Sequence, residues 1–130
     1  MNKVLITGGN GFVGNALICD LLKKNIYQVI SLVRSCKLNQ PSVEQIIAEN
    51  IFEADFPENV DVIIHLAGRA HILNDQSTDP LIEFRKVNVD GTLQLARQAL
   101  EKKVKRFIFM SSIGVNGSVT SQQPFVEDAR

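Results

Sequence analysis

The chain has 130 residues, 45% of them hydrophobic, which is enough apolar material for the core of one domain. Its 14 basic and 14 acidic residues give a formal net charge of zero, so the composition indicates neither nucleic-acid binding nor a charged partner surface. The apolar run after Met1 is far too short for a signal peptide or a membrane span, and we expect a cytoplasmic protein. Cys19 and Cys36 lack the spacing of a zinc or redox motif, and no metal site is expected.

Apolar runs typical of buried strands alternate with helical patterns along the chain. Strands are predicted at 4–6, 29–33, around 46–47, at 61–66 and at 104–110, and helices from Val13 to a stop at Asn25 and from Asp79-Pro80 to about Lys102. This alternation predicts right-handed βαβ units and an α/β fold with a Rossmann-type, doubly wound parallel sheet. Residues 124–130 have the pattern of a loop, so we expect residues 1–130 to be one incomplete domain.

The first predicted strand runs into a glycine-rich loop, in which Gly8, Gly11 and Gly14 stand three apart, and a helix follows. Glycines permit a tight turn, allow the backbone to approach a pyrophosphate, and let the helix pack close to the strand. Free N–H groups and the positive end of the helix dipole then favour phosphate. A glycine turn without a ligand is the alternative, but a strand before it and a helix after it favour dinucleotide binding.

The residue that selects between NAD and NADP is expected about 20 residues beyond these glycines, at the end of the second strand. Arg34 stands there, followed by Ser35. An acid would bind both ribose hydroxyls of NAD, whereas Arg34 and Ser35 can donate hydrogen bonds to a 2′-phosphate. NADP is therefore favoured over NAD, with a solvated surface arginine as the alternative.

Four motifs occur in the order of a known family: the loop Thr7-Gly8-Gly9-Asn10-Gly11-Phe12-Val13-Gly14, Asp61-Val62-Ile63-Ile64-His65-Leu66-Ala67-Gly68, Asn88-Val89-Asp90-Gly91-Thr92, and Ser111-Ser112-Ile113-Gly114-Val115-Asn116-Gly117. Together they resemble the extended short-chain dehydrogenases/reductases, the NAD(P)-dependent epimerase/dehydratase family of nucleotide-sugar enzymes. The resemblance covers essentially the whole chain.

The resemblance implies a role for several residues. They are Phe12 and Val13 beside the cofactor pyrophosphate, Asp55 and Phe56 at the adenine edge, Leu66, Ala67 and Gly68 along the ribose wall, Asn88 behind the nicotinamide, and Ser112 as the catalytic hydroxyl on the reacting sugar oxygen.

For some of these residues a purely structural role is the alternative. Asn88 lies on an inward helical stripe, where it could instead be tied to neighbouring backbone. Ser112 could be a simple turn serine. His65, inside a strand, is predicted to be a satisfied core histidine rather than a catalytic one. Arg69 and His71 follow that strand and could contact substrate phosphates.

As the resemblance implies, the enzyme is a nucleoside-diphosphate-sugar 4-epimerase that acts on a UDP-sugar and is a homodimer at full length. The family's Tyr-x-x-x-Lys is missing: the single tyrosine, Tyr27, has Ser31 four residues later, and the family's Val-Tyr-Gly is Val115-Asn116-Gly117 here. The resemblance therefore implies that residues 1–130 are one truncated NAD(P)-binding Rossmann domain, without the family's C-terminal substrate-binding region. We expect the 130 residues alone to be inactive. An NADPH-dependent 4-keto-sugar reductase, a dehydratase and a non-catalytic NADP-sensing module are the alternatives.

Overall fold

The computed structural model describes residues 1–34, 38–51, 53–70, 77–120 and 123–128, so Ser35, Cys36 and His71 lie outside the described residues. Five strands form one sheet in the order β3-β2-β1-β4-β5, and all of the neighbouring pairs are parallel. The strands are β1 (Asn2–Thr7), β2 (Tyr27–Val33), β3 (Glu44–Ile47), β4 (Val62–His65) and β5 (Arg106–Phe109). From β1 the chain first adds strands on one side, β2 and β3, and then on the other, β4 and β5. In doubly wound sheets, ligands bind at the carboxyl edge where the strand order reverses in this way.

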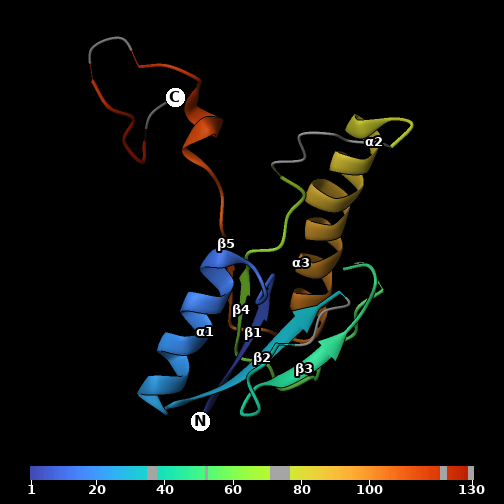
Figure 1. Ribbon diagram of the computed structural model, residues 1–130, viewed down its shortest axis with the longest axis vertical. Helices are drawn as coiled ribbons and strands as arrows, with labels where there is room; N and C mark the ends of the chain where they lie inside the picture. Colours follow the sequence, from blue (N-terminus) through green and yellow to red (C-terminus); the bar gives the residue numbers. More distant parts are fainter. Residues whose placement is uncertain (35–37, 52, 71–76, 121–122, 129–130) are drawn as a thin grey trace.

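The two faces of the sheet are covered by different helices (Figure 1). Val4 and Ile6 of β1 pack with α1 (Phe12–Lys24), whereas Leu5 between them packs with α3 (Thr92–Glu101) on the opposite face. Because side chains alternate between the faces of a strand, a β1 that is buried throughout 4–7 needs a helix on each side. The doubly wound prediction is confirmed.

The helical region after Pro80 differs from the single helix that the sequence predicts. Its start is as expected, since the Asp79 carboxylate accepts a hydrogen bond from the Ile82 N–H at 3.1 Å. The region then divides into α2 (Pro80–Arg85), the π-helical segment η1 (Lys86–Gly91) and α3. A wide π turn inserts an extra residue into the ladder and is frequent at functional sites. The predicted inward stripe is nevertheless present, with Gly91 and Leu95 buried and Asn88 half-buried.

The last predicted strand is shorter than expected, since β5 ends at Phe109. The chain then leaves the sheet and forms the short 3₁₀ helix η2 (Ile113–Asn116) (Figure 1). At the other end, α1 stops at Asn25, which adopts the left-handed conformation with φ of 50°, as the sequence predicts for a helix stop. None of the helices in the described ranges is long and apolar enough to cross a membrane.

Candidate functional site: a pocket at the carboxyl edge of the sheet

A pocket of about 380 Å³ lies at the carboxyl ends of the strands, where ligands bind in open α/β sheets. Five segments supply its walls: the glycine loop after β1, the end of β2, the loop after β3, the loop after β4 and, through Val87, η1. The predicted site residues among its walls are Gly8, Gly11, Arg34, Leu66, Ala67 and Gly68. Outside the predicted set, it is also lined by Thr7, Asn10, Leu32, Val33, residues 48–51, Arg69, Ala70 and Val87.

The glycines of the loop are required for different physical reasons. Gly8 has a φ of +73°, and a Cβ there would lie 2.8 Å from the Ala67 nitrogen. Gly14 is buried beneath the loop, where a Cβ would lie 2.2 Å from the Gly8 carbonyl oxygen. Gly11, by contrast, has only that oxygen near its Cβ position, at 3.2 Å, and lines the pocket. Gly8 and Gly14 are therefore needed for the conformation of the loop, whereas Gly11 leaves space in the pocket for a ligand.

The start of α1 is open to a ligand. Gly11 is the N-cap residue with an extended backbone, and no side chain caps the first turn. Phe12 is 95% exposed and Val13 is half exposed, so neither side chain covers this end of the helix. Uncapped N–H groups and the helix dipole suit a phosphate here, and the absence of a Cβ at Gly11 gives it a path to the backbone.

Arg34 directly follows β2 on the rim of the pocket, with its side chain exposed. Glu49, which follows β3, lines the same pocket. Arg34 and Glu49 thus place a cation and an anion along the lining of the same pocket. Since Ser35 lies outside the described residues, the second predicted donor has no position here.

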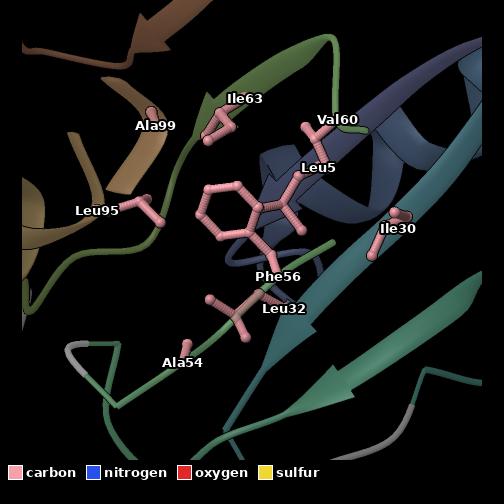
Figure 2. Packing of buried hydrophobic residues seen from close by; sticks show 9 residues of the cluster. All are labelled: Leu5, Ile30, Leu32, Ala54, Phe56, Val60, Ile63, Leu95 and Ala99. Atoms are coloured by element: carbon pink, nitrogen blue, oxygen red, sulfur yellow. The ribbon is translucent and has the colours of Figure 1, made fainter. Parts of the chain in front are cut away.

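Asp55 and Phe56 are not among the residues that line the pocket, and their place at the adenine edge stays a prediction. Phe56 is 3% exposed and lies among the core side chains between the sheet and α3 (Figure 2). Asp55 accepts a hydrogen bond from the Lys102 ammonium, whose hydrogen bond and charge lower the pKa of that carboxyl. Neither residue lines the pocket. Asn50 and Ile51 do line it, because the loop reaches the pocket directly after β3 ends at Ile47.

Asn88 is tied to backbone, which was the alternative to a direct ligand contact. Its Oδ1 accepts a hydrogen bond from the Arg69 N–H at 2.6 Å, and its Nδ2 donates to the Arg69 carbonyl at 2.9 Å. A side-chain amide that bonds both groups of one residue fixes that residue's backbone. The Arg69 guanidinium lies over the Phe84 ring, 5.4 Å from its centroid. Asn88 thus holds η1 against the loop that walls the pocket.

His65 is the satisfied core histidine that the sequence predicts. It is 1% exposed, its Nδ1 lies 2.6 Å from the Thr7 hydroxyl, and its Nε2 lies 2.9 Å from the Thr92 hydroxyl. The Phe109 ring stacks on it at 5.6 Å between centroids. Burial lowers the pKa of the imidazole to about 4, so the ring is neutral at physiological pH.

Ser112 does not line the pocket. It is exposed and caps η2, where its hydroxyl accepts a hydrogen bond from the Gly114 N–H at 3.1 Å. It follows β5, so it leaves the sheet at the same carboxyl edge as the pocket loops. The arrangement therefore brings the glycine loop, the end of β2 and the β4 loop together, and leaves Ser112 beyond them.

The sequence of the chain matches a family described as the NAD dependent epimerase/dehydratase family over residues 4–130. Among curated proteins, a UDP-glucose 4-epimerase of Vibrio cholerae is 43% identical over 122 residues, which cover 91% of this chain and 37% of that protein. A dTDP-D-glucose 4,6-dehydratase of Dictyostelium discoideum is 33% identical and matches 91% of this chain and 30% of its own length. The chain thus spans about a third of these relatives.

Solved structures share the fold. A UDP-N-acetylglucosamine 4-epimerase from Methanobrevibacter ruminantium, in complex with UDP-N-acetylmuramic acid, superposes with a TM-score of 0.79 at 26% identity, over 98% of this chain and 43% of that one. A dTDP-glucose 4,6-dehydratase from Bacillus anthracis, in complex with NAD, has a TM-score of 0.77 at 20% identity, over 100% and 44% of the two chains. The fold likeness thus reaches both epimerases and dehydratases.

Proposed function

The chain belongs to the NAD-dependent epimerase/dehydratase family, and from this premise we propose that it is the cofactor-binding part of a nucleoside-diphosphate-sugar 4-epimerase. The observation that carries the proposal is the glycine loop, where Gly11 and an uncapped helix start face a pocket at the carboxyl edge of the sheet. The similarity to the Vibrio cholerae UDP-glucose 4-epimerase favours epimerisation of a UDP-sugar over dehydration.

The residues present suit a dinucleotide laid across the edge of the sheet. The backbone of Gly11 and the first turn of α1 would bind the pyrophosphate, Asn50 and Ile51 would flank the adenine, and Leu66 with Ala67 would line the riboses. When bound, the dinucleotide would supply reversible hydride transfer at the sugar carbon, and the proton of the sugar hydroxyl would pass to a base outside these 130 residues. The Ser112 hydroxyl would share the hydrogen bond of the reacting sugar oxygen, a role for which it must turn from Gly114 toward the pocket.

A chimaera tests this function. Replacing the matched segment of the Vibrio cholerae relative with these 130 residues should give an enzyme that interconverts UDP-glucose and UDP-galactose, as followed by NMR. In that chimaera, Ser112→Ala should lower turnover roughly 10²-fold, because one hydrogen bond to the reacting oxygen is lost, with little change in cofactor affinity. The adjacent Ser111→Ala is the matched control. A 4-keto product would indicate a dehydratase, and a chimaera that binds cofactor but turns over nothing would support the non-catalytic module.

We also propose that NADP is preferred over NAD, on the ground of the exposed Arg34 at the pocket rim. A charged hydrogen bond to a 2′-phosphate contributes about 1.5–3 kcal/mol, so calorimetric titration should give NADPH at least about tenfold tighter binding than NADH. Arg34→Ala should remove the difference by weakening NADPH alone. Glu49→Gln is the control, since removing the anion should strengthen the NADPH preference. Equal affinities in the parent protein would contradict the proposal.

A further inference from the structure

The hydrogen bonds around His65 fix which ring nitrogen carries the proton. The Thr7 hydroxyl accepts a hydrogen bond from the Ala67 N–H at 3.1 Å and still has its own proton to donate to His65 Nδ1. On the other side, the Thr92 hydroxyl donates to the Asn88 carbonyl at 2.9 Å and offers a lone pair to His65 Nε2. The network is satisfied throughout only when the ring is neutral with its proton on Nε2.

This chain of hydrogen bonds reaches both ends of the segment 67–69, which forms one wall of the pocket. At one end, the Ala67 N–H is bound to Thr7, the last residue of β1 before the glycine loop. At the other end, the Arg69 backbone is bound to the Asn88 side chain, and the Asn88 carbonyl is bound to Thr92. The His65 ring joins the two halves, and the ring itself does not line the pocket.

We propose that His65 is a positioning residue of the dinucleotide pocket, and that its neutral Nε2–H tautomer holds the wall segment 67–69 in register with the glycine loop and η1. The proposal rests on the proposed dinucleotide site. Gly8 packs against the start of this wall, since a Cβ on Gly8 would lie 2.8 Å from the Ala67 nitrogen. A shift of the wall therefore disturbs the loop that binds the phosphates. Holding it in place before the ligand arrives lowers the ordering cost of binding.

Thr92 gives the cleanest variant, because it contacts the ring without lining the pocket. Thr92→Val keeps the shape of the side chain but removes the hydroxyl, so Nε2–H loses its acceptor and the Asn88 carbonyl loses a donor. Thr92→Ser keeps the hydroxyl and is the matched control. Val43→Ala, in the apolar cluster on the α1 face, controls for lost stability alone.

The protein and its three variants are titrated with NADH by fluorescence, with NADPH as a parallel arm, and melting temperatures are recorded. Thr92→Val is expected to weaken both dinucleotides by up to about tenfold, the effect of one hydrogen bond. Thr92→Ser and Val43→Ala should stay within about twofold of the parent protein. Nitrogen-15 NMR of the parent should show the His65 proton on Nε2, and Thr92→Val should change the shift of that nitrogen.

Unchanged affinity in Thr92→Val while the parent binds dinucleotide would overturn the positioning role, and so would a His65 ring protonated on Nδ1. A weakening in Val43→Ala as large as in Thr92→Val would assign the effect to stability and would overturn it as well. If the parent itself binds neither dinucleotide, the proposed site fails, and the positioning role fails with it.

Discussion

Gly11→Val is expected to abolish dinucleotide binding while leaving the fold intact. The Gly11 backbone is extended, with φ of −76° and ψ of 171°, a conformation that valine adopts without strain. Only the Gly8 carbonyl oxygen lies near the Cβ position, at 3.2 Å, so the protein itself tolerates the side chain after a small adjustment. The two methyl groups of the valine then occupy the pocket in front of the first turn of α1, where the pyrophosphate would approach the backbone.

The expected loss of NADH and NADPH affinity is at least about a hundredfold, because a clash of about 3 kcal/mol or more opposes binding. Calorimetric titration measures the affinity, and far-UV circular dichroism should be unchanged. Ala16→Val, an exposed position of α1 away from the pocket, is the control and should bind as the parent does. Normal dinucleotide affinity in Gly11→Val would refute the assignment of the glycine loop to phosphate binding.

Most strands and helices could be predicted from the sequence because each is encoded by a few adjacent residues. A buried strand, a glycine loop and an amphipathic helix were each visible in a few adjacent residues, and the structure has β1 and α1 where they were predicted. The stop at Asn25 was also local, since it depends on one residue in the left-handed conformation. The π-helical segment η1 was not predictable in this way. Its Asn88 side chain is hydrogen-bonded to the Arg69 backbone, 19 residues away, and helical periodicity does not predict a contact of that kind.

The surroundings of Asp55 and Phe56, predicted at the adenine edge, also depend on contacts between residues that are distant in the sequence. Asp55 and Phe56 were chosen from the resemblance, but their surroundings are set by Lys102, which lies 46 and 47 residues away in the sequence. Its ammonium lies 4.9 Å from the centroid of the Phe56 ring and bonds the Phe56 carbonyl, which keeps this aromatic residue in the core. The end of β3 was the available signal. Pocket loops in a parallel sheet begin where strands end, so the residues directly after Ile47 are candidates for the adenine edge as well.

Gly14→Ala is expected to destabilise the protein by about 3 kcal/mol or more, although a glycine-to-alanine change in a helix usually increases stability. Replacing glycine by alanine inside a helix ordinarily stabilises by roughly 0.5–1 kcal/mol, because alanine loses less backbone entropy on folding. Here the new Cβ would lie 2.2 Å from the Gly8 carbonyl oxygen and 2.8 Å from the Gly9 Cα. Both atoms belong to the backbone of the glycine loop, so α1 must move away from that loop to admit the methyl group.

Chemical denaturation of the parent and the variant measures the difference in the free energy of unfolding. Asn15→Ala, at the next residue of α1 and exposed, is the matched control and should be neutral or slightly stabilising. The displaced helix would also carry its first turn away from the pocket, so Gly14→Ala should weaken NADH binding even at temperatures where it is folded. A Gly14→Ala protein as stable as Asn15→Ala would mean that α1 does not pack this closely on the glycine loop.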